Sequence, residues 1–373
     1  MPYTKHLKLE QFVRQVDPQQ LKRFVFKDLA SEALVALADA GKWFDVLHQL
    51  DGRRREYIEA ELSKVNDIAN ENGMRMLLDR LSGANVPFDT EATPHQLAFS
   101  CRLEHPEIFD HVYDRYWLEQ GQTFVEYQAS KAIGATITRE AVDRLAQAIK
   151  EQASREAEGR GCAIRIYLDE DRSVLIIHHR GYRQLIEEVD EQDQVIPRIV
   201  RPAELSAVIY EPRTGKLKIH ARKQHVQERL RTLVGELLFE NRELFSDPES
   251  QEIYSLEPLK DPNFAFDVEA GDPIEGVKLT ELSLRLPMET YPRVTLQTSS
   301  GVMLAVERLG LGLTTADLKD ASARIQFRFT TKGRKGKRLT VRVKPPHTCT
   351  YDSGSPNAHY AEKCLRKWHI ARI

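Results

Sequence analysis

Apolar side chains recur every three or four residues over most of residues 1–158, as they do along the buried stripe of an amphipathic helix. Asp17 and Pro18 add a typical helix start, because the acid can cap the helix and the proline suits its first turn. We therefore predict an all-helical domain over residues 1–158. Its longest helices are expected at residues 53–72, 94–103, 106–119 and 138–157.

After residues 159–161 the pattern changes to the alternation of strands that have one buried face. Polar turns divide the alternating segments into two antiparallel hairpins, with a charged helix or loop between them. Residues 223–242 return to helical spacing and are expected to cover the resulting sheet. We predict a small α+β domain over residues 160–245. Its strands are expected at 162–168, 173–179, 207–212 and 216–222.

Residues 246–276 contain nine acids, one Lys and four prolines, a composition typical of a linker that follows the protein surface. Most acidic linkers are only solvated. A sharper hypothesis is that this segment lies on the basic hairpin near the C-terminus and competes with a polyanion for it.

Alternation returns in residues 277–373, where we predict a fourth part of α+β character. Two short helices are expected between its first strands and its basic hairpin, and Thr314 begins a capping box for the second of them. An amphipathic helix closes the chain. In order, these elements are expected at residues 280–286, 293–298, 302–309, from 314 onward, 323–344 and 357–370.

Residues 323–344 combine strand alternation with a run of positive charge that no acid interrupts. Gly333 and Gly336 lie between the two arms and allow the backbone to turn. One face of this basic hairpin is apolar and the other is cationic. Two short helices followed by such a hairpin resemble the order of a winged-helix module, with KGRKGKR as the wing. The apolar positions are Ile325, Phe327, Phe329, Leu339, Val341 and Val343.

The charge of the chain is unevenly distributed, although its net charge is only −2. Residues 321–373 hold 13 Lys or Arg against two acids, so they carry +11 and the preceding 320 residues carry −13. Such polarity indicates that one end of the chain meets a polyanion.

The basic hairpin is predicted to contact phosphates, and the outward face of the closing helix is expected to extend its charge. Phosphate contacts position a protein without reading the base sequence. The alternatives are an acidic protein partner, the chain's own acidic segment, or simple solvation. The predicted contact residues are Arg324, Arg328, Lys332, Arg334, Lys335, Lys337, Arg338, Arg342, Lys344, Lys363, Arg366 and Lys367.

Metal and cofactor signals are weak, so we assign no metal, no cofactor and no catalytic residue. A Cys and His set near the C-terminus lacks the close pairs of a structural zinc site. A metal-dependent nuclease would need an acid two residues before a Lys, and neither Lys216 nor Lys218 has one. The Cys and His set consists of His347, Cys349, His359, Cys364 and His369.

Bulk composition fits a folded soluble protein, with 41% hydrophobic and 29% charged residues. No apolar run reaches the length of a membrane helix, and the N-terminal residues do not resemble a secretory signal. Four scattered cysteines favour reduced thiols. We therefore expect a cytoplasmic location and no membrane partner.

Together these patterns predict a multidomain α+β protein that binds nucleic acid, DNA rather than RNA, without catalysing a reaction. Its helical and middle domains are expected to engage protein partners, as in an accessory component of a bacterial DNA-processing or defence system. Two alternatives stay open: a nuclease that depends on a divalent metal, and a protein-interaction scaffold whose basic tail binds an acidic partner. The sequence does not indicate an oligomeric state.

Overall fold

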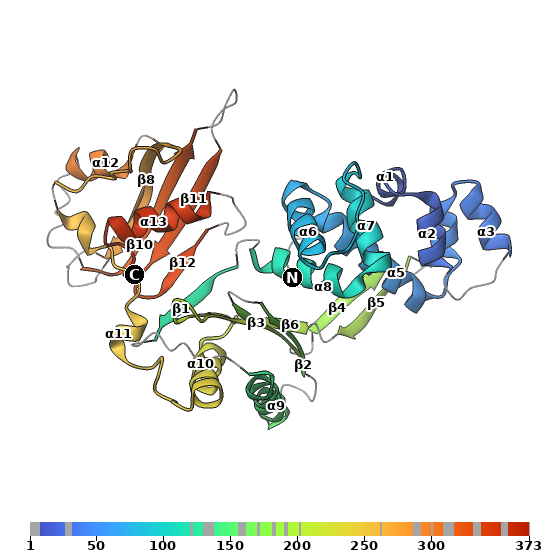
Figure 1. Ribbon diagram of the computed structural model, residues 1–373, viewed down its shortest axis with the longest axis horizontal. Coiled ribbons are helices and arrows are strands. Elements are labelled where there is room, and N and C mark those ends of the chain that lie inside the picture. The colour runs from blue at the N-terminus through green and yellow to red at the C-terminus, as the bar shows by residue number, and fades with distance from the viewer. Residues whose placement is uncertain are drawn as a thin grey trace. The chain divides into compact units, whose positions relative to one another are not determined.

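A computed structural model shows a chain of mixed helix and sheet that divides into two compact units, Met1–Gln120 and Gly121–Ile373 (Figure 1). The fold is therefore α+β, as expected. The structure describes residues 8–26, 32–119, 122–129, 138–155, 162–169, 172–180, 184–189, 193–200, 203–261, 263–285, 292–299, 301–308, 317–330, 337–351 and 357–372.

The described part of the first unit is helical, and its apolar stripes meet in one core that includes Phe12, Leu62 and Phe99. Asp17 accepts a hydrogen bond from the backbone N–H of Gln19, so the predicted cap is present. The helices are α1 (Leu9–Val13), α2 (Pro18–Val25), α3 (Glu32–Asp39), α4 (Trp43–His48), α5 (Gly52–Ile68), α6 (Glu71–Gly83), α7 (Pro94–Glu104) and α8 (Pro106–Glu119).

Glu61 is a buried acid on α5 that joins two helices of this core. It accepts hydrogen bonds from Lys64 of the same helix, at 2.6 Å, and from Arg102 of α7. Burial alone would raise the pKa of Glu61, but the Lys64 ammonium and the Arg102 guanidinium outweigh burial and lower this pKa below its ordinary value.

Replacing Glu61 by Gln is expected to lower the free energy of unfolding of the first unit by about 3 kcal/mol at pH 7, because two cations lose their partner. A lowered pKa in the folded state stabilises the fold above the unfolded pKa, about 4.3, and this contribution is lost as pH falls through the folded pKa. The difference between wild type and variant should therefore shrink below about pH 4. Urea unfolding of both proteins at several pH values measures this difference in the free energy of unfolding.

Glu59→Gln serves as the control, because Glu59 pairs with Arg55 at the surface of the same helix. That change is expected to cost less than about 1 kcal/mol. An equal loss in the two variants, or a difference that persists at low pH, would contradict the role assigned to Glu61.

The second unit is built on a ten-stranded antiparallel sheet with the order β2-β3-β6-β7-β1-β12-β11-β10-β8-β9. A separate ribbon pairs β4 with β5. The strands are β1 (Phe124–Gln128), β2 (Cys162–Leu168), β3 (Ser173–Arg180), β4 (Gln184–Val189), β5 (Val195–Val200), β6 (Ala203–Glu211), β7 (Lys216–His220), β8 (Ile274–Arg285), β9 (Arg293–Gln297), β10 (Asp317–Phe329), β11 (Arg338–Lys344) and β12 (Thr348–Thr350). The helices are α9 (Arg139–Arg155), α10 (Gln224–Phe239), α11 (Pro248–Gln251), the 3₁₀ helix η1 (Glu257–Lys260), α12 (Val302–Arg308) and α13 (Ala358–Lys367).

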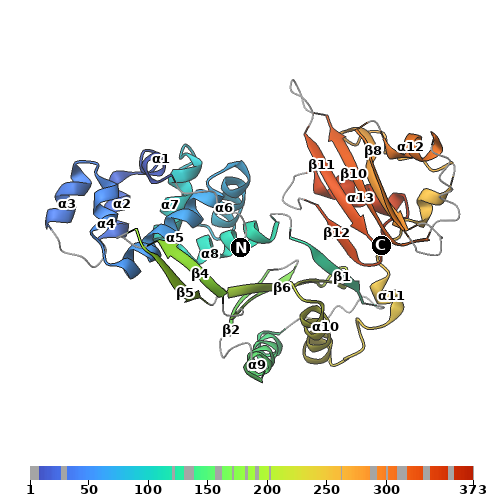
Figure 2. The same cartoon turned by 180° about the vertical axis from the view of Figure 1, so that it is seen from behind.

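One half of this sheet consists of β2-β3-β6-β7-β1, and we call it the middle half because it comes from the middle of the chain. It packs one face against α9 and α10, which lie side by side (Figures 1 and 2). The predicted hairpins are present, since β2 pairs with β3 and β6 with β7. The expected boundary at residue 158 differs from the structure, because β1 and α9 belong to the second unit. The amphipathic pattern of α9 shows which of its faces is buried, but it does not show which core that face joins.

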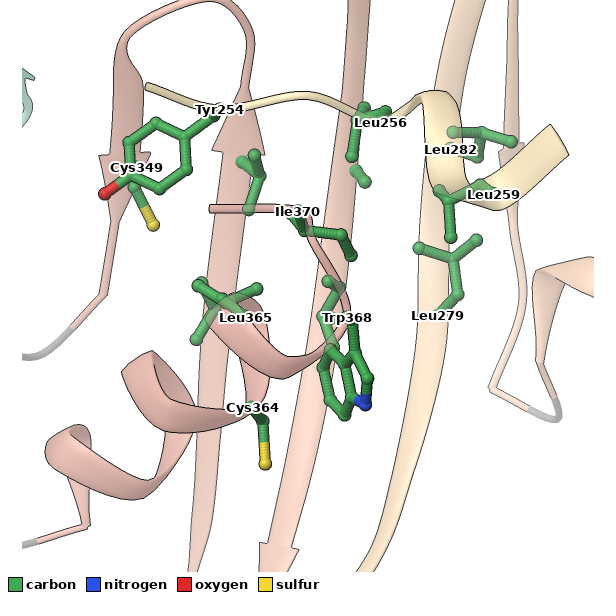
Figure 3. Close-up of a cluster of buried hydrophobic side chains, with 14 of the residues drawn as sticks. Tyr254, Leu256, Leu259, Leu279, Leu282, Cys349, Cys364, Leu365, Trp368 and Ile370 are labelled. Carbon is green, nitrogen blue, oxygen red and sulfur yellow. The ribbon is translucent and has the colours of Figure 1, made fainter. Parts of the chain in front are cut away.

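The C-terminal half, β12-β11-β10-β8-β9, packs its apolar face against α13 (Figure 3). Trp368, just after α13, stacks on Phe327 of β10 with ring centroids 5.7 Å apart. Its indole N–H donates to the backbone carbonyl of Asp267 at 2.9 Å. The predicted apolar face of the basic hairpin is therefore buried in this core, as the side of the sheet that packs against α13.

Two expectations for this region differ from the structure. Residues 246–276 are more than a solvated linker, since they contain α11 and η1 and bury Leu256 and Leu259 in the C-terminal core. The described residues also differ from the winged-helix order, because Asp317 begins the long strand β10 where a second short helix was expected to continue. Pairing with β8 and β11 along that strand outweighs the local capping signal.

A buried ionic network joins the two halves where β1 pairs with β12. Glu126 of β1 lies 3.3 Å from the Lys216 ammonium and accepts a 2.9 Å hydrogen bond from the Tyr254 hydroxyl. Burial raises the pKa of Tyr254, so the phenol keeps the proton that it donates. With these partners the carboxylate, only 3% exposed, stays satisfied inside the protein.

Candidate nucleic-acid interface

Strand alternation places a set of cations on the face of the C-terminal half opposite α13. The strands β10 and β11, which carry most of them, are labelled in Figure 2. On β10 and β11, Arg324 lies opposite Arg342 and Arg328 lies opposite Arg338. The apolar residues between them point to the core instead. We call the resulting surface the cationic face. We define it by six cations, Lys278, Arg324, Arg328, Arg338, Arg342 and Lys344.

Like charges directly opposite each other on neighbouring strands repel, and two acids reduce that repulsion here. Glu281 of β8, only 8% exposed, lies 3.1 Å from the Arg324 guanidinium and 3.9 Å from that of Arg342. Glu275 lies 3.2 Å from the guanidinium of Arg328. Two acids thus lie beside these six cations, which leaves this set of residues positive.

A depression of about 650 Å³ lies on the cationic face. Its lining includes the hydrogen-bonding side chains and cations that suit a phosphate group, and they come from four neighbouring strands and the segment after β9. The polar and charged residues of its lining are Lys278, Thr280, Gln297, Thr298, Ser299, Arg324, Gln326, Arg328, Arg338 and Thr340.

The β8 side of this depression was not predicted from the sequence. A register shift lies between the pairs Arg324–Glu281 and Ile325–Leu279, so Thr280 interrupts the alternation of β8. The Thr280 hydroxyl donates to the backbone carbonyl of Arg324 at 3.1 Å. The shift brings Lys278 beside Gln326, on the cationic face. The position of Lys278 cannot be predicted from the sequence of β8 alone, because it depends on the pairing with β10.

Three of the predicted contact residues, Lys332, Arg334 and Lys335, lie outside the described residues. Lys337 is described, and its exposed side chain lies just before β11. The structure therefore describes the cationic strands of the basic hairpin and not its turn.

The closing helix does not extend the cationic face. Cys364 and Leu365 of α13 pack on the apolar face of the sheet, so Lys363, Arg366 and Lys367 lie on the far side of the helix. The Lys363 ammonium is also held by acids, at 2.6 Å from Glu269 and 3.1 Å from Asp272. The predicted residues that the structure describes on β10 and β11 thus lie on the opposite side of the C-terminal half from those on α13.

The acidic segment 246–276 contacts cations on both sides of this half. Its residue Glu275 pairs with Arg328 on the cationic face, while Glu269 and Asp272 pair with Lys363 on α13. One acid of the segment therefore lies where the competing-segment hypothesis requires an acid.

The described residues include no group of three or more His, Cys, Asp or Glu side chains that could hold a metal ion. Cys349 and Cys364 are buried in the C-terminal core. In the middle half, Lys218 lies 2.8 Å from Glu211, and Lys216 pairs with Glu126. In each of these pairs a lysine neutralises the acid.

Thiol reactivity follows from burial, since Cys101, Cys349 and Cys364 are buried and Cys162 is half-buried. Burial raises the pKa of Cys101 to about 12 and that of Cys364 to about 11. We expect a chromogenic disulfide reagent at neutral pH to modify one thiol per native chain and all four after denaturation.

Cys162→Ser is the control, and it should leave the native chain without a rapidly reacting thiol. Rapid modification of Cys364 in the native protein would contradict its burial on the side of α13 that packs against the sheet. Zinc release during that reaction would instead support the Cys and His set as a metal site.

None of the helices in the described ranges is long and apolar enough to cross a membrane. Comparison with models of known protein families finds no match, and a search among curated proteins finds no significant similarity. We therefore infer a function from the geometry of the cationic face.

Proposed function

We propose that the protein binds nucleic acid, DNA rather than RNA, by phosphate contacts on the cationic face and along the basic hairpin. The observation that carries this proposal is the presence of two pairs of directly opposed arginines, Arg324 with Arg342 and Arg328 with Arg338. Such pairs cost folding free energy unless an anion lies beside them. The described acids supply only two carboxylates for this purpose.

The composition of the face supports backbone contact more than base readout. Arginines and small polar side chains such as Gln326 and Thr340 line the depression, and these groups suit phosphate and sugar oxygens. Each neutralised phosphate releases counterions, so binding should weaken steeply as salt increases. We expect little dependence on base sequence.

Gel-shift titration of the intact protein tests the proposal with duplex DNA, duplex RNA and single-stranded DNA of equal length at low salt. Binding that favours duplex DNA supports the proposal. The proposal would be refuted if the protein bound none of the three nucleic acids. Incubation of plasmid with the protein and Mg²⁺ or Mn²⁺ separates binding from the nuclease alternative. Cleavage that EDTA abolishes would show that the protein is an enzyme.

An acidic protein partner is the other alternative for the same surface. Polyglutamate tests this source of negative charge, because it offers carboxylates without phosphates. If polyglutamate displaces duplex DNA at an equal concentration of charge, the face recognises negative charge in general. We expect the guanidinium groups to prefer phosphate, so DNA should stay bound.

A further inference from the structure

The face of the sheet that carries the cations continues beyond β11. Lys344 of β11 lies opposite Thr348 of β12, and Thr348 lies opposite Val125 of β1. Residues that lie directly opposite each other on paired strands share one face of a sheet. Val125 packs in the core that α10 covers, so α10 lies on the same side of the sheet as the cationic face.

Arg231 of α10 lies against this continuation of the face. Its guanidinium is 5.4 Å from the centroid of the Tyr127 ring, and Tyr127 shares the face of Val125 because it lies two residues further along β1. The imidazole of His347, just before β12, stacks on the same ring with the two centroids 5.9 Å apart. We call Arg231, Tyr127 and His347 the α10 corner.

Positive charge predominates around His347. Burial, the Arg231 guanidinium and the Lys344 ammonium all lower the pKa of His347 below its ordinary value. Its Nδ1 is buried and has no hydrogen-bond partner among the described residues, so the imidazolium would bury an N–H there without an acceptor. Burial raises the pKa of Tyr127, and the exposed acid Glu228 on the preceding turn of α10 adds to this effect. His347 is therefore neutral at pH 7, although two cations lie near it.

We propose that nucleic acid bound to the cationic face continues over β12 and places a phosphate group beside Lys344 and Arg231. This inference rests on the proposed function, and it adds a contact residue from a helix outside the predicted set. Neighbouring strands lie about 4.8 Å apart, so β1 is about 10 Å beyond β11, which is the rise of about three base pairs. A phosphate at this position offsets the like charges around His347 and favours the protonated imidazole.

Replacing Arg231 by Gln is expected to weaken the binding of duplex DNA about three- to tenfold at low salt. The plot of log affinity against log salt should become shallower by about 0.9, since one phosphate contact is lost. Arg231→Lys keeps the charge and should keep the wild-type slope, which separates the charge of Arg231 from its packing on Tyr127. Fluorescence anisotropy measures affinity and slope, and circular dichroism should show that every variant keeps the fold.

Arg229→Gln is the matched control, because it removes the same charge about 200° around the same helix. Its affinity should stay within about twofold of wild type, since Arg229 points away from the α10 corner. Equal weakening by Arg229→Gln and Arg231→Gln would overturn the inference. If wild type binds the duplex and Arg231→Gln binds it equally well, only the inference fails. If wild type binds no duplex at low salt, the proposed function fails with it.

The α10 corner should also make binding depend on pH. A phosphate that raises the pKa of His347 is bound together with a proton, so affinity should increase as pH falls from about 7.5 to about 5.5. His347→Gln should reduce this increase by about threefold or more. His359→Gln is the control, because His359 is exposed on α13, on the other side of the sheet. An equal increase in wild type and His347→Gln would contradict a phosphate at this position.

Discussion

Replacing Arg338, Arg342 and Lys344 together by Gln is expected to weaken the binding of duplex DNA by roughly 100- to 1,000-fold at low salt. All three side chains are exposed on β11 and lie on the cationic face. Each lost phosphate contact should also make the plot of log affinity against log salt shallower by about 0.9. Fluorescence anisotropy with a labelled duplex measures both effects.

A matched control removes the same charge from the other side of the sheet. Lys363, Arg366 and Lys367 lie on the outward side of α13, so their replacement by Gln changes net charge equally and leaves the cationic face intact. Binding by this variant should stay within a few-fold of wild type. Equal losses in the two triple variants would show that net charge, and not this surface, governs binding.

Replacing Trp368 by Ala is expected to have the largest effect on stability. The indole is buried between Phe266 and Phe327, and it donates a hydrogen bond to the backbone carbonyl of Asp267. Truncating a buried aromatic side chain of this size costs about 3–5 kcal/mol. Because α13 and the apolar face of β10 meet at this residue, the cationic face should lose its order and its affinity for DNA.

Trp43→Ala is the comparison for this prediction, because Trp43 is buried in the core of the first unit. It should destabilise that unit, as shown by thermal unfolding, and leave the affinity for DNA close to wild type. If Trp368→Ala retained wild-type affinity, or if Trp43→Ala abolished binding, the C-terminal half would not be the part that binds.

Local signals predicted the elements that depend on nearby residues. Ile58, Leu62 and Val65 mark the buried stripe of α5, and Asp17 caps α2 as its sequence indicates. The alternation of residues 323–344 likewise showed which face of the basic hairpin would be buried. In each case the residues that determine the structure lie within a few positions of one another.

Elements that depend on distant partners were missed. Strand β1 has five residues, and it forms because it pairs with β7 and β12, which come much later in the chain. The register shift at Thr280 exists only against β10, and the ribbon of β4 and β5 could not be distinguished from a charged helix or loop. Pairing between distant strands decides which cations share a surface. The sequence therefore predicted the charge of the candidate site better than it predicted which residues lie together in it.

The most direct test of the phosphate-binding account is a titration of labelled duplex DNA with the wild-type chain at several salt concentrations. We predict binding at low salt and a log–log slope of about −3 or steeper, since roughly 0.9 is expected for each phosphate that the cationic face neutralises. Absence of binding at low salt, or an affinity that does not change with salt, would contradict it.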